Sequence, residues 1–219
     1  MKKEVKKSKK IENKFVPKII NKYEEKIGVK INREFFSNLE EETPLHFVNP
    51  KGSGVKSSGA YFHPTQNFVK IPIDDRRKNS PWYGEAIFYH EYGHAIDWQK
   101  GLKQLDSLTK IMSKHKDLVK KDIEKYKKLD QKIHELSFRA CKNNNHDLME
   151  MVGAVQDTLK SIDIRIGSGH SDDYFKQKGN SVAEFIAHAF ENKFKGKVVF
   201  KKYLPEMYED MIKWLDNSL

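Results

Sequence analysis

The runs that favour β-structure are confined to one short part of the chain. Strand-like runs occur at 29–31 and 45–48, and two more at 60–63 and 68–73 flank a short turn and predict a hairpin. After residue 80 the apolar residues recur every three or four positions, which is helical spacing. The expected fold class is therefore α+β: a mostly helical domain with a small sheet, whose hairpin precedes the first of the later helices.

Proline and glycine predict where several elements begin and end. Pro72 has no N–H for a sheet ladder, so the second hairpin strand is expected at a sheet edge. Ser80 and Pro81 form an N-cap and a first-turn proline, which predicts a helix that Gly101 ends. An earlier helix is expected after Pro17, with its end at Gly28.

Residues 102–145 carry a pattern of their own. Apolar residues from 105 to 136 alternate between spacings of three and four, and His115 and Asp122 interrupt this heptad-like series. We expect one or two long helices here, inserted into the domain and either projecting from it or packed across it. Further helices are expected at 148–162, 182–194 and 206–215.

The composition excludes several classes of protein. The single cysteine, Cys141, excludes an internal disulfide framework and a cysteine-based structural zinc site. No run of 18 apolar residues exists, so no membrane span or membrane partner is expected. The Met-Lys-Lys start is not followed by an apolar stretch, so we expect no signal peptide and a cytoplasmic location.

The positive charge is concentrated near the N-terminus. Residues 1–30 hold eleven lysines and four glutamates, which accounts for seven of the ten net positive charges. We expect residues 1–15 to form a flexible basic arm, followed by one domain over residues 16–219. The arm is either a solvated tail or an electrostatic contact for nucleic acid or another anionic partner. Its lysines are not interleaved with aromatic residues or arginines, so a contact with phosphate would be non-specific.

One segment carries the signature of metal chemistry, namely His90-Glu91-Tyr92-Gly93-His94. On a helix, two histidines four residues apart share a face, so both imidazoles can reach one ion. Glu91 is placed to take a proton from a water molecule that zinc has made acidic. We therefore expect His90 and His94 to bind Zn²⁺ and Glu91 to be the general base.

A zinc hydrolase needs a third protein ligand. A third histidine in His-x-x-Gly-x-x-His spacing is absent, which leaves a glutamate from a later helix. Glu184 is the best candidate because it is acidic on an otherwise apolar helix face, where a carboxylate is costly to bury without a cation or donors. One alternative stays open, since Ser181-x-x-Glu184 also has the spacing of a capping box.

Two runs resemble a known group of enzymes. His-Glu-Tyr-Gly-His-Ala-Ile-Asp at 90–97 and Glu-Phe-Ile-Ala-His-Ala-Phe at 184–190 look like the Glu-zincin metallopeptidases of the anthrax lethal-factor type. They look closer still to the zincin-like domains attached to phage minor head (head morphogenesis) proteins. Similar segments also occur at 59–64, 153–157 and 169–174. The matching segments lie within roughly residues 59–101 and 150–215.

This resemblance implies a zincin-like metallopeptidase fold, zinc held by His90, His94 and Glu184, and Glu91 as the base. It also implies a tyrosine before the glutamate helix that donates to the developing oxyanion. The family's tyrosine falls at the position of Gln177, so two donors are candidates here: Tyr174 and His170.

Two further residues have candidate roles around the metal ligands. His188 stands where the family usually has an acidic residue, and it is either an outer partner of the ligands or an ordinary core histidine. Asp97 follows His94 by three residues and could orient a ligand imidazole.

The expected function is zinc-dependent hydrolysis of a peptide or protein substrate, with the peptide held along an exposed edge strand. The phage resemblance offers an alternative: a virion structural or assembly protein that retains the zinc site, has capsid or portal proteins as partners, and is found in the virion as well as the host cytoplasm. A second alternative is an effector or toxin protease that acts on one host protein.

Overall fold

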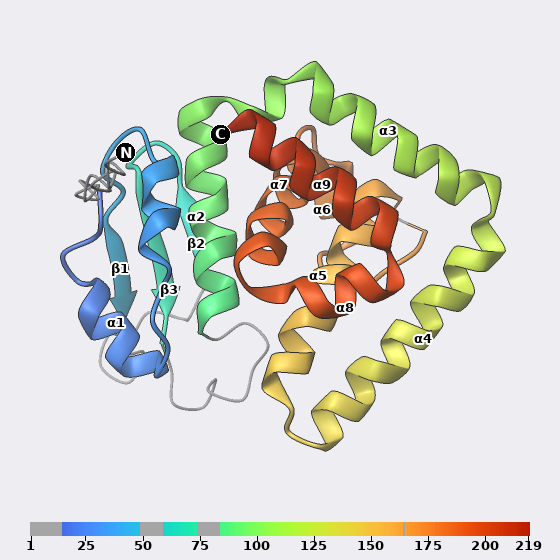
Figure 1. Cartoon of the computed structure of the whole chain (residues 1–219), viewed down its shortest axis with the longest axis horizontal. Helices are drawn as coiled ribbons and strands as arrows, with labels where there is room; N and C mark the ends of the chain where they lie inside the picture. The colour runs from blue at the N-terminus through green and yellow to red at the C-terminus, as the bar shows by residue number, and fades with distance from the viewer. Residues whose placement is uncertain (1–14, 49–58, 74–83, 164) are drawn as a thin grey trace, which may run out of the picture.

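The computed structural model describes residues 15–48, 59–73, 84–163 and 165–219. The predicted basic arm, apart from Phe15, and the predicted helix start at Ser80 and Pro81 lie outside the described residues. The described part is mostly helical and contains one small sheet, which agrees with the predicted α+β class (Figure 1). Within these ranges, no helix is both long and apolar enough to cross a membrane.

The sheet has three strands in the order β1-β3-β2. β2 (Tyr61–His63) and β3 (Phe68–Pro72) form the predicted hairpin and pair antiparallel, with Phe62 opposite Val69. β1 (Leu45–Val48) pairs parallel to β3 on its other side. The outer strand beside the helices is therefore β2, the first strand of the hairpin (Figure 1).

The prediction that Pro72 marks an edge strand is wrong, because β3 is the middle strand of the sheet. Pro72 is the last residue of β3 and lies opposite Val48, the last residue of β1. At the end of a ladder no further N–H is required, so the missing proline donor costs little there.

The N-terminal part confirms one predicted helix and contradicts one predicted strand. α1 (Ile20–Ile27) ends at Gly28, which adopts the left-handed conformation with φ of 76°. The run at 29–31 forms no strand, since the N–H of Ile31 donates to Glu24 Oε1 at 2.8 Å. The Glu24 carboxylate, buried at the end of α1, thus replaces a ladder partner.

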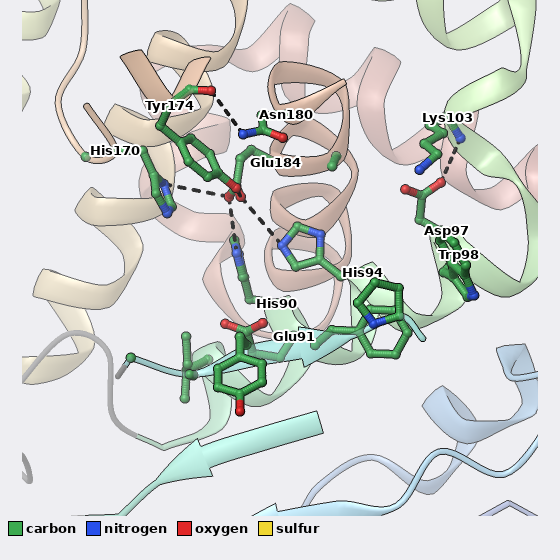
Figure 2. A pocket seen from close by; sticks show the side chains of 18 residues that line it. His90, Glu91, His94, Asp97, Trp98, Lys103, His170, Tyr174, Asn180 and Glu184 are labelled. Atoms are coloured by element: carbon green, nitrogen blue, oxygen red, sulfur yellow. Dashed lines mark hydrogen bonds and ion pairs between the residues drawn. The ribbon is translucent and has the colours of Figure 1, made fainter. Parts of the chain in front are cut away.

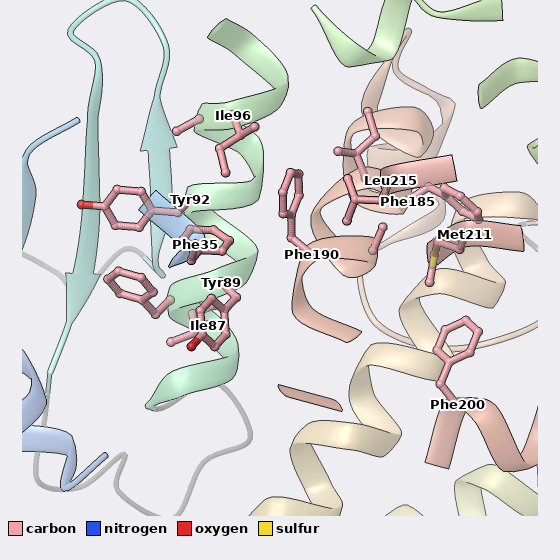
Figure 3. Close-up of a cluster of buried hydrophobic side chains, with 14 of the residues drawn as sticks. Phe35, Ile87, Tyr89, Tyr92, Ile96, Phe185, Phe190, Phe200, Met211 and Leu215 are labelled. Atoms are coloured by element: carbon pink, nitrogen blue, oxygen red, sulfur yellow. The ribbon is translucent and has the colours of Figure 1, made fainter. Parts of the chain in front are cut away.

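Helix α2 (Glu85–Lys100) is the centre of the molecule. It lies between the sheet on one side and the C-terminal helices on the other (Figure 1). Phe35 packs against Tyr92 of α2, and Phe190 of α7 lies against Gly93 of α2 on the side of the C-terminal helices (Figure 3). Gly101 ends α2 in the left-handed conformation, as predicted.

The heptad-like region forms two helices, α3 (Asp106–Lys121) and α4 (Ile123–Lys142). They pack across the domain rather than project from it: α3 contacts α9 (Pro205–Ser218), and α4 contacts α5 (His146–Ile162) (Figure 1). The interrupting His115 is buried in the first of these contacts, where its Nε2 bonds Asp210 Oδ2 at 2.9 Å.

Several short helices differ from the prediction. The predicted elements do not include α6 (Asp172–Lys176), which Ser171 caps by accepting a hydrogen bond from Tyr174 N at its Oγ. Helix α7 (Asn180–Glu191) is followed directly by a further helical segment that begins at Asn192. The remaining helices in the described ranges are η1 (Arg33–Asn38), η3 (Leu102–Gln104), the π-helical η4 (Asn192–Gly196) and α8 (Lys197–Tyr203).

Candidate metal centre

A pocket of about 840 Å³ opens between the edge strand β2, helix α2 and helix α7 (Figure 2). Residues 59–62 and Pro64 form the wall on the strand side. His90, Glu91 and His94 enter from α2, and Glu184 enters from α7. The predicted metal ligands and the predicted base thus lie together in one pocket.

The carboxylate of Glu184 faces both motif histidines. Its Oε2 lies 3.3 Å from His90 Nε2, and its Oε1 lies 3.6 Å from His94 Nε2. Two ligands of one tetrahedral zinc ion, with bonds of about 2.0–2.1 Å, are separated by about 3.3 Å. The two distances therefore match the spacing of donors around a single ion.

The hydrogen bonding around Glu184 also fits a site that binds a cation. Glu184 is almost fully buried, and its Oε2 has no hydrogen-bond partner. A buried carboxylate oxygen without a donor is costly unless a cation is present. Two imidazole nitrogens and one carboxylate are ligands that zinc prefers, so these three residues could hold it.

The charges of two of the three side chains agree with this assignment. Burial lowers the pKa of His90, but Glu184 and Glu191 outweigh burial and hold that pKa well above its usual range, so His90 has to release a proton when it binds a metal. Burial alone would raise the pKa of Glu184, but the neighbouring His90 outweighs burial and holds that pKa well below its usual range. Burial lowers the pKa of His94 to about 4. At neutral pH Glu184 is therefore ionised and His94 is neutral, which are the forms that bind a metal.

Glu184 is not a helix cap, so the capping-box alternative is wrong. Helix α7 begins at Asn180 with Gly179 as its N-cap, which places Ser181 inside the first turn. Ser181 Oγ donates to Phe175 O at 3.1 Å instead. The Glu184 carboxylate makes its contacts across the pocket, to α2 and to Tyr174.

Glu91 lies in the pocket beside the strand. Burial raises the pKa of Glu91 to about 7, while His90 and a hydrogen bond from the backbone N–H of Phe62 oppose that rise. The same N–H links the carboxylate to the edge strand. Glu91, which projects from α2, is thus held against the strand wall of the pocket.

His170 and Tyr174 both reach the pocket, but they are engaged differently (Figure 2). The Tyr174 hydroxyl donates to Glu184 Oε1 at 2.6 Å. His170 Nδ1 bonds Asp157 Oδ2 at 2.9 Å. The imidazole of His170 stacks on the ring of Tyr174, with 4.3 Å between the ring centroids. Tyr174 therefore supports Glu184, whereas His170 has its Nε2 available.

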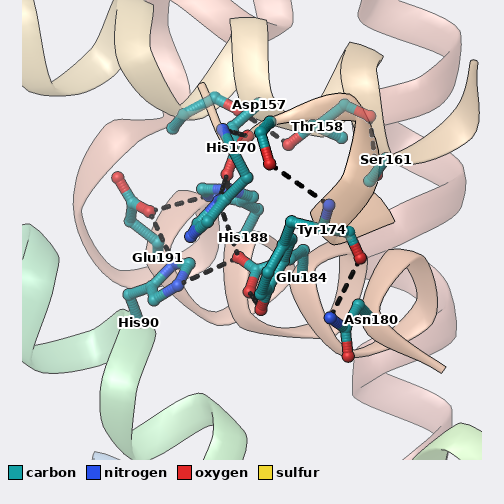
Figure 4. Close-up of polar contacts among 12 residues, drawn as sticks. His90, Asp157, Thr158, Ser161, His170, Tyr174, Asn180, Glu184, His188 and Glu191 are labelled. Atoms are coloured by element: carbon teal, nitrogen blue, oxygen red, sulfur yellow. Dashed lines mark hydrogen bonds and ion pairs between the residues drawn. The ribbon is translucent and has the colours of Figure 1, made fainter. Parts of the chain in front are cut away.

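A polar network behind the pocket contains residues to which the sequence assigned no role. Asp157 accepts hydrogen bonds from the backbone N–H of His170 at 3.0 Å and bonds His188 Nε2 at 3.0 Å (Figure 4). His188 Nδ1 bonds Glu191 Oε2 at 2.9 Å. The test that selected Glu184, an acidic residue on an apolar helix face, would also have selected Asp157 on α5.

Only glycine fits at position 169, where the loop closes onto Asp157. Gly169 has φ of 136°, and a Cβ there would lie 2.1 Å from Asp157 Oδ1. This close approach brings both the N–H and the ring of the next residue, His170, onto the carboxylate.

In the described part of the chain, two groups of donor atoms lie within 4.8 Å of one another, and neither contains His94: His90, Glu184 and His188, and Asp157, His170 and Glu184. Both ring nitrogens of His188 already bond carboxylates, and the Asp157 carboxylate already takes part in three hydrogen bonds. Because the donor atoms of His188 and Asp157 are engaged in this way, His90, His94 and Glu184 are the better ligand set.

Asp97 does not orient a ligand imidazole as expected. Its Oδ1 accepts a hydrogen bond from the backbone N–H of Lys103 at 2.7 Å, which closes the turn after α2. Burial raises the pKa of Asp97, and this hydrogen bond opposes the rise. Its role is therefore at the helix end.

Comparison of the chain with protein-family models, with curated proteins and with solved structures gave no match.

Proposed function

We propose that this protein is a zinc-dependent peptide hydrolase of the Glu-zincin kind, with His90, His94 and Glu184 as the metal ligands. The observation that carries the proposal is the Glu184 carboxylate, which faces both histidines at 3.3 and 3.6 Å and keeps one buried oxygen without a hydrogen bond. When bound, zinc polarises a substrate carbonyl group and lowers the pKa of a water molecule.

Glu91 is the general base. It lines the same pocket as the three ligands, next to His90 in sequence, and its carboxylate is fixed by the Phe62 N–H. A buried carboxylate at this position takes the proton from the attacking water and then returns it to the leaving amine. The Phe62 hydrogen bond keeps one side of the carboxylate turned to the strand.

His170 donates to the negative charge that develops on the substrate carbonyl oxygen. Asp157 holds its Nδ1, so the Nε2 is the nitrogen that remains for the substrate. Burial lowers the pKa of His170, but Asp157 and Glu184 outweigh burial and raise it, which favours the ring that donates from both nitrogens. Tyr174 positions Glu184 through its 2.6 Å hydrogen bond.

The pocket suits an extended peptide. Its strand wall belongs to β2, which among the described residues pairs with β3 on one side and with no strand on the other. The free edge of a strand binds a peptide through main-chain hydrogen bonds. A peptide along β2 would place a carbonyl group between Glu91 and His170.

An open pocket also argues for catalysis over a purely structural zinc site. Structural zinc sites have four protein ligands, whereas catalytic sites have three and leave one position for water or substrate. The ligand set here has three members and borders the pocket. This favours the hydrolase over a virion protein in which the metal serves only the fold.

The test measures metal content and hydrolysis separately. Purified protein should hold about one zinc ion per chain by elemental analysis. With a mixture of fluorogenic peptides as substrate, Glu91→Gln should keep the zinc and lose hydrolysis at least about 100-fold. Glu85→Gln is the matched control, since Glu85 lies on the same helix but contacts Tyr89 and Lys195.

Two outcomes would contradict the proposal. Wild-type protein that neither contains zinc nor takes it up on addition would exclude the metal site. A Glu91→Gln variant with full hydrolysis would show that Glu91 is not the base.

A further inference from the structure

A row of alternating acidic and histidine side chains runs through the core directly behind the candidate metal centre (Figure 4). Its middle member is His188 on α7, which is completely buried. His188 Nε2 lies 3.0 Å from Asp157 Oδ2 on α5, and its Nδ1 lies 2.9 Å from Glu191 Oε2, one turn along α7. Helices α5 and α7 are therefore joined at this point by one imidazole.

Both ring nitrogens of His188 face a carboxylate oxygen, so both must donate. The ring is then a buried cation between two buried anions. Breaking such an arrangement by removing one partner is costly, since it leaves a charge without compensation. Asp157 and Glu191 hence depend on His188 to stay ionised and in place.

Each end of the row continues to a residue of the proposed active site. Glu191 Oε2 lies 3.4 Å from His90 Nδ1, the ring nitrogen opposite the one that faces Glu184; this is an ion-pair contact, because that nitrogen has no aligned hydrogen-bond partner. Asp157 bonds both the ring and the backbone of His170. A carboxylate on the outer nitrogen of a metal-binding histidine fixes its ring and its tautomer.

We propose that His188 is a positioning residue that aligns His90 through Glu191 and His170 through Asp157, so that one buried imidazole orients a metal ligand and the oxyanion donor together. This inference rests on the proposed function for the roles of His90 and His170. The coupling itself is a property of the metal-free protein.

The competing explanation is that His188 only stabilises the core. The chain offers a matched control for that explanation in His115, which is also buried and also bonds a carboxylate, Asp210 Oδ2 at 2.9 Å. His115 lies between α3 and α9 and does not line the pocket. A purely structural histidine should behave like His115 when it is replaced.

The first experiment compares zinc affinity, by chelator competition, in folded His188→Gln and His115→Gln proteins. Glutamine cannot donate to both carboxylates with the ring's geometry, so His188→Gln should weaken zinc binding about 10- to 100-fold, as expected for loss of an outer partner. His115→Gln should lower the melting temperature and leave zinc affinity at the wild-type value. Equal zinc affinity in the two variants would overturn the proposal.

The two arms can be separated, which also covers a His188 variant that does not fold. Glu191→Gln should weaken zinc binding, because Glu191 contacts His90. Asp157→Asn should keep zinc but reduce peptide hydrolysis, because Asp157 holds His170. If both variants lose only thermal stability, the row is structural and the proposal is wrong.

A measurement on metal-free protein distinguishes failure of this inference from failure of the proposed function. Ring ¹⁵N resonances should show both nitrogens of His188 protonated and a single tautomer for His170. In His188→Gln the ring resonances of His90 and His170 should both shift, in Glu191→Gln those of His90 should shift, and in His115→Gln neither should. Absence of zinc binding in wild type with these shifts present would refute the hydrolase alone; unchanged resonances would refute the coupling.

Discussion

Replacing Gly93 by alanine should damage zinc binding more than it damages the fold. Gly93 lies within the motif on α2 and faces α7. A Cβ there would lie 3.0 Å from Phe190 Cδ2 and 3.2 Å from Ala187 Cα. Ordinary carbon contacts are about 3.5–4.0 Å, and Phe190 is completely buried, so its ring has no space to move into. The two helices must separate by a few tenths of an ångström.

The cost to folding is small because two effects oppose each other. Overpacking of a core costs about 1–3 kcal/mol. Alanine is the better helix former by about 1 kcal/mol. The free energy of unfolding should therefore fall by only about 0–2 kcal/mol.

The cost to zinc binding is larger because the ligands lie on the two helices that separate. His90 and His94 are on α2 and Glu184 is on α7. Metal–ligand distances are held to within about 0.2 Å, so a shift of a few tenths of an ångström disturbs them. We expect the zinc affinity of Gly93→Ala to fall about tenfold or more, which corresponds to about 1.4 kcal/mol.

The assay pairs chelator competition for zinc with urea unfolding. Gly59→Ala is the control, since Gly59 lines the same pocket but a Cβ there would meet nothing within 4 Å. It should keep wild-type zinc affinity. A Gly93→Ala protein that binds zinc as tightly as wild type would refute the argument that the α2–α7 distance sets the ligand geometry.

Two further predictions concern Glu184 and Glu24. Glu184→Ala should release zinc to a mild chelator, whereas Ser181→Ala should cost little stability and keep zinc; equal retention in both would exclude Glu184 as a ligand. Burial raises the pKa of Glu24, but hydrogen bonds from Arg33, Lys30 and the Ile31 N–H outweigh burial and lower it from 4.5 to about 2. At about 1.4 kcal/mol per pKa unit this carboxylate contributes about 3 kcal/mol above pH 4.5. The stability gap between wild type and Glu24→Gln in urea unfolding should close as the pH falls from 4.5 towards 2, and a gap independent of pH would contradict the assignment; Glu25→Gln on the same helix is the control.

The sequence alone determined the features that depend on neighbouring residues. The 3.6-residue periodicity predicted α2, α5, α7 and α9. Gly28 and Gly101 marked helix ends, because glycine adopts the positive φ that a helix end requires without strain. The spacing of His90 and His94 put both on one helix face. Glu184 stood out because an acidic residue among apolar ones signals a buried carboxylate with a partner.

Only the tertiary structure decided which segments meet. It placed β3 in the middle of the sheet despite Pro72, since a missing N–H matters only where a partner strand continues. It turned Glu184 towards α2 instead of its own helix end, and it joined Asp157, His188 and Glu191 behind the pocket. Apart from the His188–Glu191 bond within α7, those contacts connect positions tens of residues apart. They form because burying the faces of α2, α5 and α7 together leaves the few charged side chains no water to bind, so that they find partners on another helix.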